Sequence, residues 1–163
     1  MSRTIYDSWR DFQLSFAQIL AGATSDLCIF DDDLGKTGIA SNANMKILRA
    51  LLVKNPEALV RIALRDTRSL EYLHPHLVQL LRTRAHNLKI QKVSGIHVPW
   101  RDCMILADGR HAAVRFDLEH PRCKLVLDDI EEVEPYSQLF EEIWATPGTP
   151  FLPEATGLSV GLS

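Results

Sequence analysis

The chain has 163 residues, of which 46% are hydrophobic and 24% are charged, and its formal net charge is −3. These values are typical of one globular domain and exclude a low-complexity or repeat protein. No apolar run is long enough to span a membrane, and the charged N-terminus does not resemble a signal peptide. Three widely spaced cysteines, Cys28, Cys103 and Cys123, are expected to be free core thiols, so we expect a cytoplasmic protein.

Charge is distributed unevenly along the chain. Residues 61–92 contain seven basic and two acidic residues, whereas residues 128–142 contain seven acidic residues and no basic one. Two solvated faces of opposite sign explain this pattern, and a basic surface for a phosphate-bearing ligand or an acidic partner is the alternative. The basic residues are Arg61, Arg65, Arg68, Arg82, Arg84, Lys89 and Lys92.

The first half of the chain alternates helices with short apolar strands. Apolar residues at helical spacing from Trp9 predict a helix that ends near Gly22, and we assign residues 1–22 to an N-terminal helix. Apolar runs at 27–30, 58–65 and 88–93 predict buried strands. A helix capped at Ser41 or Asn42 separates the first two strands, and a leucine pattern interrupted by Pro75 predicts either a kink or a fresh helix starting there. The inward residues of the capped helix are Met45, Leu48, Leu51 and Leu52.

The second half is predicted to be a strand meander followed by a helix. Strands are expected at 103–107, 111–116 and 123–127, and Asp108-Gly109 is a strong signal for a hairpin between the first two. Pro135 is expected to open the last helix, and residues 146–163 to form a C-terminal tail. This order favours an α/β fold in which helices cover both faces of a mixed β-sheet.

Residues 101–109 carry a recognisable motif. They read Arg-Asp-Cys-Met-Ile-Leu-Ala-Asp-Gly, which resembles the signature strand of the phospholipase D superfamily, His-x-Lys-x-x-x-x-Asp-Gly. Asp108 and Gly109 match in register, and Phe140 and Trp144 match a pattern in a late helix of the family. The resemblance covers residues 25–145. It implies a single-motif bacterial member with one phospholipase D-like domain at 1–145, in which β-α-β-α-β is followed by a β-meander and a closing helix.

The catalytic residues of that signature are missing. The resemblance implies that a histidine attacks phosphorus and that a lysine two positions later stabilises the developing charge. In this sequence these positions hold Arg101 and Cys103, and the Gly-Ser that follows in the family is replaced by Arg115-Phe116. Arginine stays protonated and cannot act as a nucleophile or proton shuttle. We therefore expect no catalytic residues and a pseudoenzyme.

No displaced copy of the motif is present. His120-Pro-Arg122 followed by Asp128 has arginine in place of lysine and one residue too many before the acid. His97 has no aspartate at the required distance. A turn histidine is the favoured interpretation of His120.

Metal binding is disfavoured as well. His74 and His76 have no carboxylate or cysteine at ligand spacing, and surface histidines are the favoured interpretation. The acidic residues 31–33 could hold a divalent cation, but a solvated loop after a strand is the more common arrangement. We therefore expect no metal and no cofactor.

Three functions remain open. The first is a catalytically inactive interaction or regulatory module with an unknown protein partner. The second is a phosphate or nucleic-acid binding module that uses a basic surface around Arg61, Arg65 and Arg101. The third is unrelated chemistry at Cys103 or the histidines, which the position of Cys103 within an apolar strand disfavours.

Arg101 has two interpretations of its own. Its guanidinium could grip an anion, or it could pair internally with an acid such as Asp102 or Asp108. Single-motif members of the family often pair with their motif strands facing each other across a two-fold axis. The resemblance therefore implies a homodimer, and no membrane span is expected.

Overall fold

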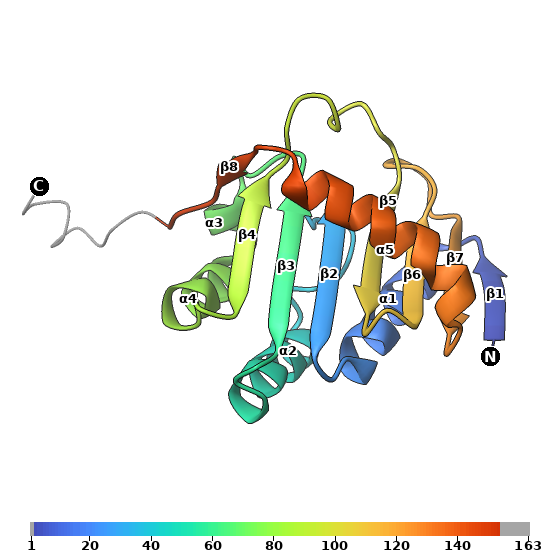
Figure 1. Cartoon of the computed structure of the whole chain (residues 1–163), viewed down its shortest axis with the longest axis horizontal. Helices are drawn as coiled ribbons and strands as arrows, with labels where there is room; N and C mark the ends of the chain where they lie inside the picture. Colours follow the sequence, from blue (N-terminus) through green and yellow to red (C-terminus); the bar gives the residue numbers. More distant parts are fainter. Residues whose placement is uncertain (1, 154–163) are drawn as a thin grey trace, which may run out of the picture.

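A mixed sheet of eight strands forms the centre of the computed structural model, which describes residues 2–153 (Figure 1). The order across the sheet is β1-β7-β6-β5-β2-β3-β4-β8, in which β2, β3 and β4 are parallel and the other neighbours antiparallel. The predicted α/β fold class is confirmed. The elements are β1 (Ser2–Tyr6), α1 (Trp9–Gly22), β2 (Asp26–Asp31), α2 (Asn42–Lys54), β3 (Leu59–Leu64), α3 (Leu70–Leu73), α4 (Pro75–Thr83), β4 (Leu88–Lys92), β5 (Cys103–Ala107), β6 (His111–Arg115), β7 (Cys123–Leu127), α5 (Ile130–Ala145) and β8 (Thr149–Pro150).

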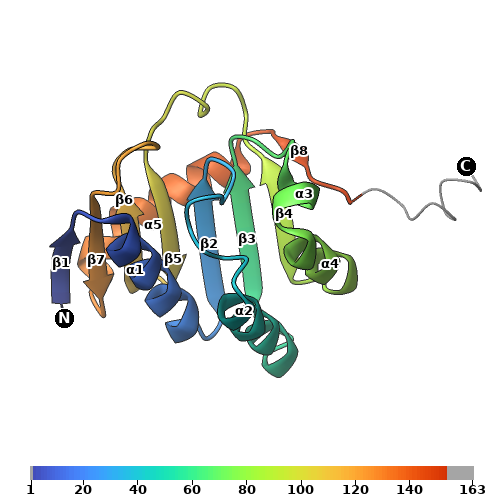
Figure 2. The same ribbon diagram turned by 180° about the vertical axis from the view of Figure 1, so that it is seen from behind.

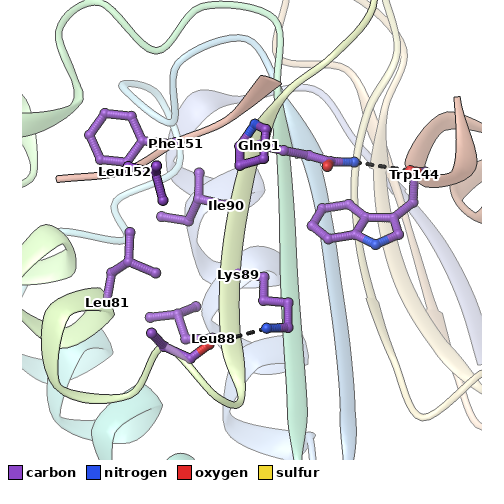
Figure 3. A pocket seen from close by; sticks show the side chains of 10 residues that line it. Leu81, Leu88, Lys89, Ile90, Gln91, Trp144, Phe151 and Leu152 are labelled. Carbon is purple, nitrogen blue, oxygen red and sulfur yellow. Dashed lines mark hydrogen bonds between the residues drawn. The ribbon is translucent and has the colours of Figure 1, made fainter. Parts of the chain in front are cut away.

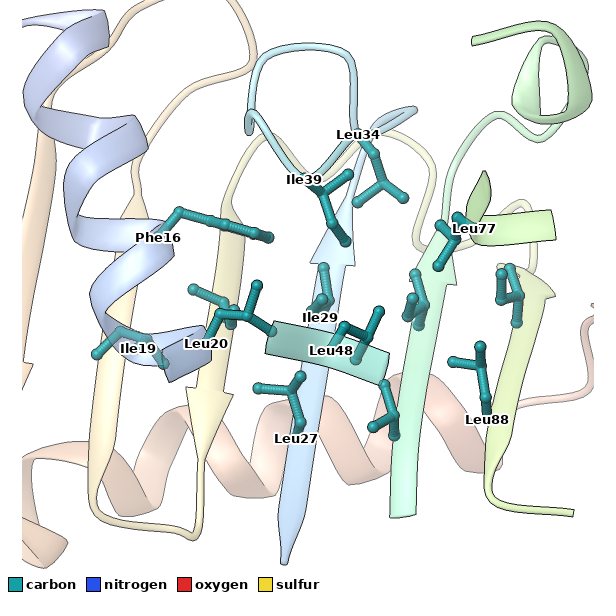
Figure 4. Close-up of a cluster of buried hydrophobic side chains, with 14 of the residues drawn as sticks. Phe16, Ile19, Leu20, Leu27, Ile29, Leu34, Ile39, Leu48, Leu77 and Leu88 are labelled. Carbon is teal, nitrogen blue, oxygen red and sulfur yellow. The ribbon is translucent and has the colours of Figure 1, made fainter. Parts of the chain in front are cut away.

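Helices cover both faces of the sheet. Figure 2 shows α1, α2 and α4 on one face, and Figure 1 shows α5 crossing the other. The central strand β2 is buried on both sides, as predicted: Leu27 and Ile29 pack in the larger core beneath α1 and α2 (Figure 4), whereas Cys28 and Phe30 pack in the smaller core beneath α5. This alternation follows from the two-residue period of a strand.

Local signals explain where the helices begin. The Ser8 hydroxyl accepts a hydrogen bond from the backbone N–H of Asp11, and the Ser41 hydroxyl does the same for Asn44, so both serines cap their helices. Pro75 occupies the first turn of α4, so of the two predicted alternatives the structure has the fresh helix rather than the kink. Over residues 2–153, no helix has the length and apolar character needed to cross a bilayer.

Two predicted helix boundaries are wrong. Residues 2–6, assigned to an N-terminal helix, form β1, because pairing with β7 outweighs their weak local preference. The last helix begins at Ile130 rather than at Pro135, because Asp129 caps it by accepting a hydrogen bond from the Glu132 backbone. Pro135 lies inside the helix and removes one backbone donor there.

The start of the predicted C-terminal tail is attached to the sheet. Thr149 and Pro150 pair with Lys92 and Gln91 of β4, and the Phe151 backbone N–H donates to the Ile90 carbonyl at 2.8 Å. Residues 154–163 of the predicted tail lie outside the described residues. The domain boundary at residue 145 stays a prediction.

Candidate functional site

Four buried polar side chains meet at one end of the sheet. Asp31 ends β2, Arg65 follows β3, Cys103 begins β5 and Arg115 ends β6, so the topology brings these ends together. Their relative exposures are 3%, 5%, 1% and 1%, respectively. We call these four residues the arginine–cysteine cluster. Burial of two guanidinium groups beside a single carboxylate is unusual, because unpaired charge is costly inside a protein.

The two arginines converge on the thiol of Cys103. Arg115 Nη2 lies 3.2 Å and Arg65 Nη1 lies 3.6 Å from Cys103 Sγ. Arg115 Nη2 is also 3.5 Å from Asp31 Oδ1, and Arg65 Nη2 donates to the Asp102 carbonyl. The buried Arg65 Nε and Arg115 Nη1 groups have no hydrogen-bond partner within the described part of the chain.

Aromatic rings form the walls of the cluster. The Arg65 guanidinium carbon lies 4.1 Å from the ring centroid of Phe30, and that of Arg115 lies 4.6 Å from Phe12 and 5.2 Å from Trp9. These cation–π contacts stabilise charge that is removed from water. Helix α1 therefore holds Arg115 from one side of the sheet.

Cys103 is poorly suited to nucleophilic chemistry. Burial raises the pKa of its thiol to about 12, and the negative charge of Asp31 acts in the same direction. Arg115 and Arg65 oppose this shift but do not outweigh it. The protonated thiol is an inert group at neutral pH, which disfavours the hypothesis of cysteine chemistry.

Arg101 lies outside the strand that carries the motif. β5 begins at Cys103, and the Arg101 side chain, 53% exposed, forms a bidentate pair with Asp117: Nε to Oδ2 at 2.6 Å and Nη2 to Oδ1 at 2.9 Å. The hydrogen bonds from Arg101 hold the pKa of Asp117 well below its ordinary range. The internal partner is thus neither Asp102 nor Asp108, and Asp108 lies at the opposite end of β5.

The segment 116–122 is fixed beside the cluster. Arg115 Nε donates to the Asp117 carbonyl at 2.9 Å, and Lys36 Nζ donates to the Leu118 carbonyl at 3.3 Å. His120 Nδ1 lies 3.1 Å from Asp117 Oδ1, so this exposed histidine belongs to the Arg101–Asp117 pair. Arg101, Arg115 and His120 therefore all contact Asp117.

Asp108 organises the other end of β5. Its carboxylate accepts five hydrogen bonds: from the backbone N–H groups of Thr24, Ser25 and Asp26 at 2.9, 2.9 and 3.0 Å, and from two hydroxyls. Asp108 and Gly109 have φ values of 56° and 67°, which suit the tight hairpin turn that was predicted. The motif aspartate thus ties the β5–β6 hairpin to the start of β2.

Arg61, Arg65 and Arg101 are not brought together. Arg61 projects toward α5, where Nη1 and Nη2 contact Glu141 at 2.7 and 2.6 Å and the guanidinium stacks 5.3 Å from the ring of Phe140. Arg65 belongs to the buried cluster and Arg101 pairs with Asp117. A single basic surface made of these three side chains is not present.

Two of the remaining histidines are buried, so the expected surface position is wrong for His74, whereas His76 is exposed as expected. The buried His74 lies with Nε2 3.2 Å from the Asp33 carbonyl, and the buried His97 lies with Nε2 3.1 Å from Thr146 Oγ1. Burial lowers the pKa of His74, so its ring favours the neutral form. Over residues 2–153, no group of three histidine, cysteine or acidic side chains is arranged to hold a metal ion.

The acidic triplet after β2 shapes the following loop. Asp31 Oδ2 accepts from the Leu34 backbone at 2.7 Å, and Asp33 Oδ1 accepts from the Gly35 backbone at 2.8 Å. Burial raises the pKa of Asp32, and the charge of its neighbours adds to the shift. Two of the three carboxylates are therefore occupied by backbone donors.

Two of the hollows near β4 differ in their chemistry. One, of about 390 Å³, opens over Arg65 and is also lined by Arg68, Lys92 and two aspartates. The other, of about 280 Å³, is apolar and lies between α4, β4 and Phe151-Leu152 (Figure 3). Its polar groups are occupied, because Gln91 binds the Trp144 carbonyl and Lys89 the Ala85 carbonyl. The hollow over Arg65 is therefore the better candidate for a polar ligand.

A family model described as "Domain of unknown function (DUF7931)" matches residues 9–149. The chain belongs to this family. No curated protein sequence matches the chain significantly.

Solved structures similar to this DUF7931 chain define its fold. Nuc from Salmonella typhimurium, a phospholipase D family member, matches with a TM-score of 0.67 and 11% identity over 93% of this chain and 99% of its own. NucT from Helicobacter pylori matches with a TM-score of 0.59 and 12% identity, over 92% and 99% of the two chains. The fold of the DUF7931 chain is phospholipase D-like, as the motif predicted.

A third similar structure belongs to a DNA-binding protein. TrmBL2, an archaeal chromatin protein described with a novel mode of DNA binding, matches with a TM-score of 0.65 and 15% identity. The match covers 88% of the DUF7931 chain and 52% of TrmBL2, so the chain spans about half the length of that protein.

Sequence reasoning missed the partners of the motif residues. It singled out Arg115 only as a replacement for glycine, and it considered Asp31 only as a possible metal ligand. It did not single out Asp117. Arg101 and Asp117 are 16 positions apart, and Asp31 and Arg115 are 84 positions apart. No local sequence pattern could have indicated contacts over such separations.

Proposed function

We propose that this DUF7931 chain is a phospholipase D-like module without phosphodiesterase activity that acts by binding a partner. The observation that carries the proposal is the arginine–cysteine cluster. At the start of β5, where the family signature places its ammonium group, the structure has the buried thiol of Cys103 beneath two guanidinium groups.

The chemistry of the cluster opposes hydrolysis. Attack on phosphorus needs an unprotonated nucleophile with a free electron pair, whereas both arginines are permanently protonated and the thiol stays protonated because burial raises its pKa to about 12. Among the described residues, no histidine hydrogen-bonds a member of the cluster. Neither an imidazole nucleophile nor an imidazole general acid is positioned there.

A chromogenic phosphodiester, bis(p-nitrophenyl) phosphate, tests the proposal at high protein concentration. We expect no release of nitrophenol above that of heat-denatured protein. The Arg101→Ala variant is the matched control, because it changes the position that aligns with the family nucleophile. Turnover by the wild type that disappears in Arg101→Ala would contradict the proposal.

A second candidate function is binding of phosphate or nucleic acid at the hollow over Arg65. It is favoured by the unpartnered Nε of Arg65 and by the presence of Arg68 and Lys92 in the same lining. The TrmBL2 likeness supports it, because a protein of the same fold binds DNA. However, Arg68 already pairs with Asp66 at 2.8 Å, and its hydrogen bonds lower the pKa of Asp66 to about 2.

Fluorescence anisotropy with labelled oligonucleotides tests this candidate. If the hollow binds phosphate, affinity should fall steeply as salt rises, because the contacts release counterions. Lys92→Glu should abolish binding, whereas Lys54→Glu, in the last turn of α2, should leave it unchanged. Absence of binding at low salt would reject the candidate.

A further inference from the structure

Among the described residues 2–153, nothing pairs with the outer side of β1. Within this range β1 is the terminal strand of the sheet, and its one partner is β7 (Figure 1). Four of its five residues are exposed. An edge of this kind presents unpaired backbone N–H and C=O groups that can pair with another strand.

The opposite edge of the sheet is protected in a way that β1 is not. There the short strand β8 covers the end of β4 and includes Pro150, which has no backbone donor. Short edge strands and proline are devices that prevent pairing with other chains. β1 has neither device, because it is five residues long and contains no proline.

The ladder between β6 and β7 shows which backbone groups of β1 point outward. The Phe116 N–H donates to the Arg122 carbonyl, so the even-numbered residues of β7 face β6. The odd-numbered residues of β7 therefore face β1, where they lie opposite Ser2, Thr4 and Tyr6. The N–H and C=O groups of Arg3 and Ile5 consequently point away from the sheet.

We propose that β1 pairs with β1 of a second copy of this chain, in antiparallel orientation about a two-fold axis at Thr4. In this register Arg3 lies opposite Ile5 of the other copy, and the two residues exchange both backbone hydrogen bonds. Thr4 lies opposite its own copy in a pair without hydrogen bonds, an arrangement in which two threonines pack favourably. The two sheets become one continuous sheet.

The charges of the strand favour its own copy as the partner. Arg3 is the charged residue of β1, and antiparallel pairing places it beside a neutral isoleucine rather than beside another Arg3. Arg3 Nη1 is already neutralised by Glu132 Oε1 at 3.0 Å, in the first turn of α5. Ile5, which is 42% exposed, would lose water-accessible apolar surface at this edge.

This interface differs from the homodimer implied by the family resemblance, in which two motif strands face each other. In the present chain the motif strand β5 is internal, between β2 and β6, whereas β1 is terminal. The proposal is independent of whether the module hydrolyses phosphodiesters. Substitutions in β1 should change dimerisation without changing phosphodiesterase activity, so the two proposals can be tested separately.

Cysteine cross-linking tests the register directly. In the proposed dimer the Cα atoms of the two Thr4 residues lie about 4.5 Å apart, within the range of about 4.4–6.8 Å that a disulfide bridges. Thr4→Cys should give a covalent dimer under mild oxidation with diamide. Ser2→Cys, on the same face of the strand, is the control: its two copies lie roughly 13 Å apart and should not cross-link.

Sedimentation velocity on the intact chain provides the second test. We expect a concentration-dependent dimer that Ile5→Pro abolishes, because proline removes an outward N–H without removing a bond to β7. Ile5→Thr keeps that N–H and should still dimerise. Circular dichroism checks that Ile5→Pro is folded. If it is not, the Thr4→Cys and Ser2→Cys variants test the interface in its place. A wild type that stays monomeric into the millimolar range, or a dimer that persists in folded Ile5→Pro, would overturn the proposal.

Discussion

The two ends of β5 differ in how well they match the phospholipase D signature. At the end of the strand, Asp108 accepts five hydrogen bonds and ties the hairpin to β2, and its identity matches the phospholipase D signature. At the start of the strand, Arg101 pairs with Asp117 outside the strand, and Cys103 lies buried beneath Arg65 and Arg115. The residue that supports the fold is present, whereas the residues that would perform chemistry are replaced.

This difference teaches that the two halves of the motif depend on different forces. The Asp108 turn stabilises the fold, because its carboxylate pairs three backbone N–H groups at the start of β2 that would otherwise lack an acceptor. At the other end the side chains are held by charge compensation, because buried guanidinium groups must be paired or stacked. Here Asp31, the Asp102 carbonyl and three aromatic rings provide that compensation.

The largest effect is expected from breaking the arginine–cysteine cluster. Arg115→Met removes the guanidinium beside the buried Asp31, which should lower the free energy of unfolding by about 3–5 kcal/mol in urea titrations. Arg122→Met, at an exposed arginine in the same segment, should change it by less than about 0.5 kcal/mol. Equal stability of the two variants would show that the buried contact is not needed.

The next effect is expected at the Asp108 turn. Asp108→Ala leaves three backbone donors without their acceptor and places alanine at a positive φ, so unfolding should become easier by about 2–3 kcal/mol. Asp108→Asn tolerates this backbone conformation and keeps one carbonyl acceptor. Asp108→Asn should therefore lose less stability than Asp108→Ala. If the two variants were equally unstable, the negative charge of Asp108 would be the property that stabilises the turn.

Acid should weaken the Asp108 end selectively. Burial opposes ionisation of this carboxyl, but the hydrogen bonds from Ser25, Asp26 and Thr24 together outweigh burial and lower its pKa. Its contribution to stability is therefore present above the unfolded value of about 3.9 and is lost as the pH falls through the lower folded value. The difference in urea midpoint between wild type and Asp108→Asn should shrink on acidification below about pH 4. A constant difference would contradict this coupling.

The smallest effects are expected from the groups that replace the catalytic residues. Arg101→Ala removes an exposed ion pair and should leave the thermal unfolding midpoint unchanged within error, because such pairs contribute little. Cys103 should resist a thiol reagent in the folded protein and react only after unfolding, because burial raises its pKa to about 12. Rapid labelling of Cys103 in the folded chain would restore cysteine chemistry as a hypothesis.

The sequence by itself determined the elements that depend on local chemistry. The stripe from Trp9, the Ser41 cap and the Asp108-Gly109 turn occur as predicted, and of the two alternatives at Pro75 the fresh helix is found, because each rests on periodicity, capping or backbone conformation within a few residues. The apolar runs predicted β2 to β7, and the motif indicated a phospholipase D-like fold.

Only the tertiary structure decided which distant groups meet. Residues 2–6 form β1 because they pair with β7, and α5 begins after its cap Asp129 rather than at Pro135. Arg101 forms its ion pair with Asp117 rather than with Asp102. The cluster of Asp31, Arg65, Cys103 and Arg115 depends on the strand order of the sheet. Local sequence could not show these contacts, because they join residues from separate strands and loops whose proximity is fixed only when the whole sheet has formed.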